Sequence, residues 1–143
     1  MKICIINGPN LNLLGKRETT IYGEKPFEEY YEQIKKDYPS ISFEYYQSNV
    51  EGELINKIQE VGFYVDGIIL NAGGYTHTSV ALADTISAIE SPVIEVHISN
   101  IYAREAYRHE SLTAKKCLGI IAGFGFKSYS LAINYFLSEK VSD

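Results

Sequence analysis

The chain has 143 residues, of which 45% are hydrophobic and 22% are charged, and its net charge is −5. This composition is typical of one globular domain spanning residues 1–143, and the negative charge without a basic stripe argues against a nucleic-acid partner. No apolar run approaches the roughly 20 residues that cross a membrane, and the N-terminus begins with a strand pattern instead of a signal sequence. We therefore expect a cytoplasmic protein without a membrane segment.

Strand and helix patterns alternate along the chain. Short apolar or alternating runs between turn residues predict strands at 2–6, 41–47, 65–70, 93–97 and 117–122. Helical spacing predicts helices at 25–37, from a Ser48 or Asn49 cap to Gly62, at 80–89 after a Thr78 or Ser79 cap, and from 126 to about 138. A short helical stretch is expected at 103–109 within an irregular section.

This alternation predicts the α/β class. Three of the strands are near-continuous apolar runs, which is typical of a parallel sheet covered on both faces. Five βα units fit a flavodoxin-like doubly wound fold, with a five-stranded parallel sheet of order 2-1-3-4-5. Ligands of such sheets bind beyond the carboxyl ends of the strands, so we expect the site at the ends of the first, third and fourth strands.

Residues 8–23 follow the first strand as an unusually long connection. Loops in α/β units commonly need only about 2–6 residues, and longer ones are usually functional or disordered. This stretch has leucines for packing and glycines at which the chain can hinge, so we predict an ordered lid over an active site.

Two pairs of side chains could supply acid and base chemistry. Glu95 and His97 are two apart on a strand and share a face, where the carboxylate could orient the imidazole as a general acid. A solvated surface pair fits this spacing equally well. Arg17 and Tyr22 share the lid, where a guanidinium could stabilise the phenolate and make it a base. An arginine stacked on a tyrosine at the loop surface is the alternative.

The remaining polar residues near the expected site are amides, a histidine and two arginines. Asn10 and Asn71 could donate to a developing negative charge or simply form turns. His77 lies in a threonine-rich turn and could cap it or bind a ligand. Arg104 and Arg108 are four apart, so one helical face could present both to a carboxylate or polyol, or to solvent.

Together these groups suit proton abstraction next to a carbonyl, with acid-assisted loss of a leaving group. We find no nucleophile–base pair for acyl transfer, and the glycine-rich turns lack dinucleotide or P-loop spacing. Cys4 and Cys117 are expected to be buried, reduced thiols. The sequence contains no Cys-x-x-Cys or His-x-x-x-His spacing, so we do not expect a structural or catalytic zinc ion.

Four motifs carry a resemblance to a known family. They are GPNLNLLG at 8–15 with Arg17 and IYG at 21–23, NAGGYTHTS at 71–79, EVHISN at 95–100 with ARE at 103–105, and GFG at 123–125 before Tyr129. In this order they resemble type II 3-dehydroquinate dehydratase nearly end to end. The resemblance implies anti elimination of water from 3-dehydroquinate to 3-dehydroshikimate, in the shikimate pathway or in quinate breakdown, without metal or cofactor.

The resemblance also implies roles for individual residues. The implied catalytic residues are Tyr22 as base, Arg17 as its activator, Asn10 as an enolate stabiliser through a water, and His97 as the acid that Glu95 orients. The implied substrate-binding residues are Asn71, the backbone N–H groups of Ile98 and Ser99, His77 and Arg108, with Arg104 in support. Asp84 would come from a neighbouring subunit, because the family forms homododecamers built from trimers.

The sequence departs from the family pattern at Val50, where many members have His, and over 110–115 (ESLTAK). We expect these departures to affect subunit contacts and loop shape, and we assign them no chemical role. Two alternatives to an active enzyme are a flavodoxin-like binding or signalling module and an inactive relative kept for assembly. A phosphoacceptor module needs Asp where Asn71 stands, and none of the family's chemical residues is missing.

Overall fold

The computed structural model describes residues 1–16 and 18–142. Its strands form one five-stranded parallel sheet of order β2-β1-β3-β4-β5, which confirms the predicted α/β fold and strand order. The strands are β1 (Lys2–Asn7), β2 (Ser42–Gln47), β3 (Gly67–Asn71), β4 (Val93–His97) and β5 (Gly119–Ala122). The α-helices are α1 (Thr19–Tyr22), α2 (Phe27–Asp37), α3 (Glu51–Val61), α4 (Val80–Ala88) and α5 (Lys127–Ser142).

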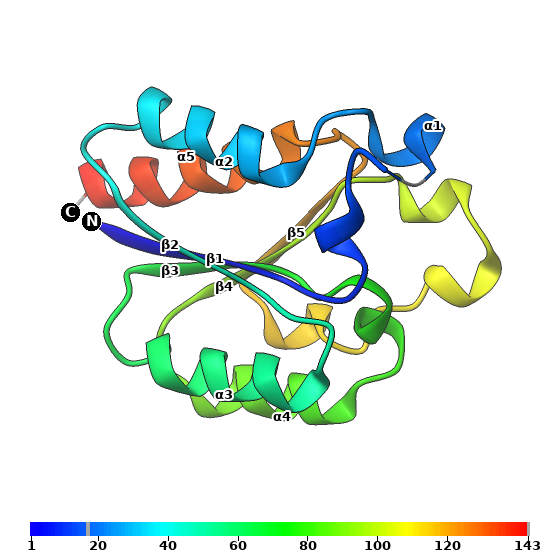
Figure 1. Cartoon of the computed structure of the whole chain (residues 1–143). Coiled ribbons are helices and arrows are strands. Elements are labelled where there is room, and N and C mark those ends of the chain that lie inside the picture. Colours follow the sequence, from blue (N-terminus) through cyan, green and yellow to red (C-terminus); the bar gives the residue numbers. More distant parts are fainter. Residues whose placement is uncertain (17, 143) are drawn as a thin grey trace.

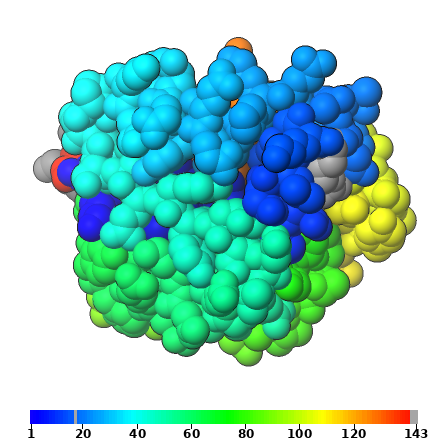
Figure 2. Space-filling model, in the orientation of Figure 1, coloured from blue at the N-terminus to red at the C-terminus, as the bar shows by residue number. Residues whose placement is uncertain are grey.

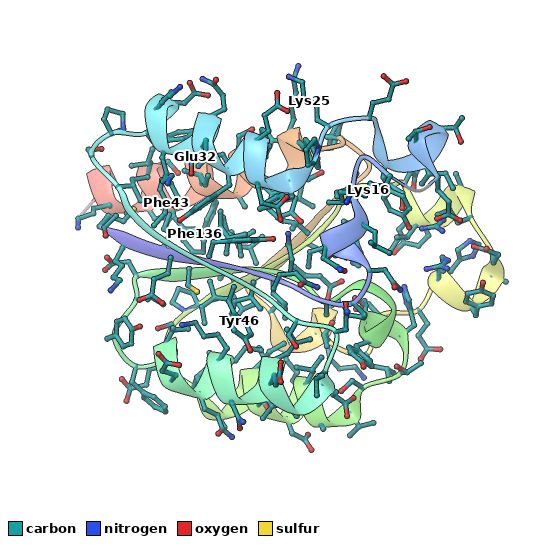
Figure 3. The ribbon with its side chains drawn as sticks, in the orientation of Figure 1. Lys16, Lys25, Glu32, Phe43, Tyr46 and Phe136 are labelled. Atoms are coloured by element: carbon teal, nitrogen blue, oxygen red, sulfur yellow. The ribbon has the colours of Figure 1, made fainter. Side chains whose placement is uncertain are left out.

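Helices cover both faces of the sheet. Figure 1 shows α2 and α5 on one face and α3 and α4 on the other, with the N-terminus and the end of α5 on the side opposite the 8–23 connection. Phe43 and Phe136 lie on the side of α2 and α5, whereas Tyr46 lies on the side of α3 and α4 (Figure 3). In the described part of the chain, no helix has the length and apolar character needed to cross a membrane.

Strand β1 shows why the sheet is buried on both faces. Ile3 and Ile5 pack into the core beneath α2 and α5, and Cys4 and Ile6 pack into the core beneath α3 and α4. All four side chains are buried. Full burial of one such isoleucine contributes about 1.5–3 kcal/mol, so a continuous apolar run stabilises a central strand through both layers.

The irregular segments differ from the sequence prediction. The 8–23 connection contains a 3-10 turn at Leu11–Leu13 and the short helix α1. The helical stretch expected at 103–109 is wrong, because two separate 3-10 turns, Ile101–Ala103 and Ala106–Arg108, flank an extended Arg104. Ser79 caps α4 through the Leu82 N–H, as one of the two proposed caps, whereas α3 begins after Val50 without a side-chain cap.

Two glycines allow close packing around the lid. A Cβ atom on Gly8 would lie 2.5 Å from the carbonyl oxygen of Ala72, so only glycine lets the ends of β1 and β3 approach this closely. Gly15 has a φ of +90°, and a Cβ atom there would lie 2.8 Å from the Glu24 carbonyl oxygen. The lid therefore folds back on the chain that leads into α2.

A buried hydrogen-bonded chain joins the ends of two strands to α5. The Tyr129 hydroxyl donates to Asn7 Oδ1 at 2.8 Å and accepts from Asn71 Nδ2 at 2.9 Å. Tyr129 is fully buried, and this burial raises the pKa of its phenol far above the ordinary value. The neutral hydroxyl can then act as donor and acceptor at once, which fixes the orientation of the Asn71 amide.

The Tyr129→Phe substitution removes the hydroxyl that both buried amides use. We expect it to lower the free energy of unfolding by about 1–3 kcal/mol, the usual cost of leaving buried polar groups unpaired. Urea unfolding followed by circular dichroism measures this change. Tyr38→Phe is the matched control, because its hydroxyl donates to Asn134 Oδ1 at the surface. Equal losses in the two variants would contradict the role of the buried chain.

Candidate active site

A cavity opens at the carboxyl ends of the strands, where the sequence predicts the site. It encloses about 670 Å³, including space continuous with solvent. Figure 2 shows the lid, in blue, beside the yellow segment that follows β4 at this edge of the molecule. Most of the predicted site residues line the cavity: Asn10, Tyr22, Asn71, His77, His97, Ile98, Ser99, Arg104 and Arg108.

Tyr22 meets a cation from another part of the chain. Arg104 Nη1 donates to the Tyr22 hydroxyl at 2.7 Å and to Ser99 Oγ at 3.3 Å. The guanidinium carbon also lies 5.4 Å from the centre of the Tyr22 ring. A positively charged donor to a phenolic oxygen stabilises the phenolate relative to the neutral phenol. Arg104 is thus placed to do what the sequence assigned to Arg17, which lies outside the described residues.

Glu95 and His97 form the predicted pair. Both side chains are buried, and His97 Nε2 lies 2.9 Å from Glu95 Oε2. A carboxylate can only accept this hydrogen bond, so Nε2 of His97 carries the proton. Nδ1 is then the nitrogen that can contact a ligand. Burial of the pair rules out the solvated surface pair that the spacing alone also allowed.

The carboxylate of Glu95 is held by two hydroxyl groups as well as by His97. Ser111 Oγ lies 3.0 Å from both carboxylate oxygens, and Thr113 Oγ1 donates to Oε1. Burial alone raises the pKa of Glu95, but the hydrogen bonds from His97, Thr113 and Ser111 outweigh it and hold the pKa below its ordinary value. Glu95 is therefore a buried carboxylate that stays ionised.

His77 and Arg108 lie on the side of the cavity formed by the segments after β3 and β4. His77 Nδ1 is 2.7 Å from the Glu110 carbonyl oxygen, and its ring stacks on His97 at 6.2 Å between centroids. Arg108 Nε donates to Glu105 Oε2 at 2.8 Å. A hydrogen bond from its own backbone N–H, and then Arg108, lower the pKa of Glu105 to about 2, so this surface ion pair persists at neutral pH.

The two predicted amides have distinct supports. Asn10 adopts a left-handed backbone with a φ of 71°, and its N–H donates to Asn49 Oδ1 at 3.0 Å. Asn71 uses Nδ2 toward Tyr129, and its Oδ1 accepts from the Gly73 N–H at 3.2 Å. A side-chain amide carries two N–H groups, so Asn71 retains one for a ligand.

Two predicted site residues in the described part of the chain do not line the cavity, Glu95 behind His97 and Asp84 on α4. Asp84 is exposed on α4 and does not line the cavity within this chain. The sequence assigned it to a neighbouring subunit, and its position leaves that prediction open. Among the described residues, no group of three or more His, Cys, Asp or Glu side chains could hold a metal ion.

Several supporting residues were missed from the sequence. Ser111 and Thr113 hold Glu95, Asn49 holds Asn10, and Tyr129 holds Asn71. The sequence shows only that Ser111 and Thr113 are two residues apart. That spacing does not reveal which carboxylate they meet, because the contact joins segments far apart in the chain.

Comparisons with known proteins identify the family of this chain. Residues 1–137 match the family model for Dehydroquinase class II. A 3-dehydroquinate dehydratase from Fusobacterium nucleatum is 54% identical over 96% of this chain and 97% of its own length. One from Campylobacter jejuni is 54% identical over 93% of this chain and 85% of its own length.

A solved structure supports the same assignment at the level of the fold. The type II dehydroquinase from Butyrivibrio crossotus superposes with a TM-score of 0.92 and 48% identity, covering 95% of this chain and 97% of its own. The family match covers nearly all of the chain, and the site residues that define the cavity lie within it. This chain belongs to the class II dehydroquinase family.

Proposed function

We propose that this chain is an active 3-dehydroquinate dehydratase that eliminates water through an enolate, in the shikimate pathway. One observation carries the proposal: the Tyr22 hydroxyl bound to Arg104 and the imidazole of His97 bound to Glu95 line the same cavity. This gives one activated base and one oriented acid around a single ligand. The names of the similar proteins from Fusobacterium and Campylobacter support the choice of substrate.

Proton abstraction would begin at Tyr22. Its phenolate takes the C2 proton of 3-dehydroquinate, and the electron pair of that C–H bond moves to form an enolate at the C3 carbonyl. Arg104 favours the phenolate by donating to the same oxygen. Asn10, held by Asn49 at the cavity wall, would hold a water against the enolate oxygen, where negative charge develops.

Loss of water would follow at His97. As the enolate collapses, its oxygen re-forms the C3 carbonyl, the π electron pair between C2 and C3 moves to form the C1–C2 double bond, and the C1–O bond breaks. The leaving hydroxide takes a proton from the imidazolium and departs as water. Glu95 stabilises the imidazolium and fixes its orientation.

Binding of the substrate would use the remaining groups of the cavity. The charged side chains among its described lining residues are Arg104 and Arg108, which suits a substrate bearing a carboxylate. Asn71 and the backbone N–H groups of Ile98 and Ser99 would hold the carboxylate and the C1 hydroxyl. His77 and Arg108 would bind the ring hydroxyls. Residues 8–23 would act as a lid, because they bring Tyr22 to the cavity.

Assembly would complete the site. Asp84 lies on the outer side of α4, so it can reach a cavity only in a neighbouring copy. We propose a homododecamer built from trimers, in which each Asp84 contributes to the adjacent site.

The main test is an ultraviolet assay for the conjugated enone of 3-dehydroshikimate, with 3-dehydroquinate as substrate and EDTA present. We expect product from the wild type and a loss of turnover of at least about 10²-fold in Tyr22→Phe, the lower limit for a lost general base. Tyr22→Phe should still bind substrate in calorimetry, and Tyr38→Phe should keep full activity. A folded wild type without product would refute the proposal.

Replacing Arg104 tests the activation of Tyr22. Arg104→Gln removes the cationic donor, so we expect kcat to fall by about 10²-fold while KM changes little. Arg108→Gln is the matched control, because Arg108 would act in binding and its loss should raise KM instead. Steady-state kinetics separate the two. Equal effects on KM in both variants would show that Arg104 is only a binding group.

Asp84→Asn tests the contribution of the neighbour. We expect it to impair activity, while Asp37→Asn on α2 should not. Co-expression of Asp84→Asn with Tyr22→Phe should restore part of the activity, because mixed assemblies contain some sites with both intact residues. A stable monomer in analytical sedimentation, or no complementation from mixed assemblies, would refute the role of Asp84.

A further inference from the structure

The Glu95 carboxylate has hydrogen-bond partners in addition to His97. It is completely buried in β4 and has hydrogen bonds to an imidazole and to two hydroxyl groups. The hydroxyl groups belong to Ser111 and Thr113, in the segment that the sequence comparison left without a chemical role. Neither residue lines the cavity. Any effect on the reaction would therefore act through Glu95 and His97.

The segment that carries these hydroxyl groups is itself anchored. The Leu112 N–H donates to the Thr76 carbonyl oxygen at 2.9 Å, beside His77. Ser111 Oγ accepts the Ala114 N–H at 3.0 Å, which leaves the hydroxyl proton for Glu95. Thr113 is completely buried, so its hydroxyl has little freedom to turn elsewhere. The two donors are thus fixed in place before any ligand binds.

We propose that Ser111 and Thr113 are positioning residues that keep Glu95 as a carboxylate and hold its Oε2 toward His97. This inference rests on the proposed function for its kinetic consequences. Buried carboxylates without donors tend to take up a proton, and a protonated Glu95 could no longer stabilise an imidazolium. With both hydroxyl groups in place, Glu95 stays ionised and can stabilise the imidazolium that the leaving group needs.

Other ionisable groups near Glu95 are few. His97 lies on the same strand, and His77 stacks on His97 from the turn after β3. Cys117 lies before β5, and burial first and the charge of Glu95 second raise the pKa of its thiol to about 12. A neutral thiol adds no charge to the pair. The hydroxyl donors are thus the groups besides His97 that favour the ionised form of Glu95.

Thr113→Val tests the proposal, because it keeps the shape of the side chain and removes the donor. We expect kcat to fall about tenfold with little change in KM, a part of the roughly 10²–10⁴-fold effect of a general acid. The acid limb of the kcat profile should move to higher pH, because Glu95 becomes easier to protonate. Thr113→Ser should restore both values.

Thr85→Val is the matched control. Thr85 is also buried, but its hydroxyl donates to the Ala81 carbonyl oxygen within α4. We expect it to change stability without moving the acid limb. Ser111→Ala is the second test variant and remains informative if Thr113→Val does not fold, since Ser111 is only half-buried. It should move the acid limb in the same direction.

Nuclear magnetic resonance separates this inference from the proposed function. The chain has three histidines, so labelling Cε1 with carbon-13 gives few signals, and His97→Asn identifies the signal of His97. The pH at which this signal responds to protonation of Glu95 should rise in Thr113→Val, even if the wild type does not dehydrate 3-dehydroquinate. A folded Ser111→Ala/Thr113→Val variant with wild-type titration and an unmoved acid limb would overturn the inference.

Discussion

Parallel pairing of all five strands is the constraint on which the site depends. Parallel strands cannot be joined by tight hairpins, so each connection runs back along one face of the sheet. The carboxyl ends of all five strands therefore lie at the same edge. The order β2-β1-β3-β4-β5 places α2 and α3 on opposite faces, on either side of β1. The loops after β1, β3 and β4 therefore emerge together, and the cavity is built from them.

Polar groups buried at this edge determine how the cavity is lined. Glu95 is buried in β4, and Asn7 and Asn71 are the last residues of the neighbouring strands β1 and β3. A buried polar group without partners is costly, so each of these side chains is fixed by hydrogen bonds to residues behind the cavity. Tyr129 serves the two amides, and Thr113 serves the carboxylate. Side chains that line the cavity are thus held in orientation by buried side chains that do not line it.

The base of the proposed reaction depends on two segments that are far apart in the chain. Tyr22 comes from the lid and Arg104 comes from the turns after β4, 82 residues later. Their hydrogen bond links the lid to the segment that also carries Arg108. In the proposed reaction, a basic Tyr22 would therefore require the segment that carries it to lie against Arg104.

The sequence by itself determined the fold class, the strand order and the edge at which the site lies. Apolar runs and helical spacing are local patterns, and few topologies connect such units in a parallel sheet. Most of the residues that the sequence proposed for the site line one cavity in the structure, among them Asn71 and His97.

Only the tertiary structure decided which side chains meet. The burial of the Glu95–His97 pair within β4 depends on the segments packed around that strand. The pairing of Arg104 with Tyr22 and the contact of Thr113 with Glu95 join separate segments. Spacing along one strand or helix cannot reveal such contacts. Residue spacing also predicted one helical stretch around Arg104. The structure has an extended Arg104 between two short 3-10 turns instead. Local periodicity reports on neighbours within one element, whereas the chemistry depends on distances between elements.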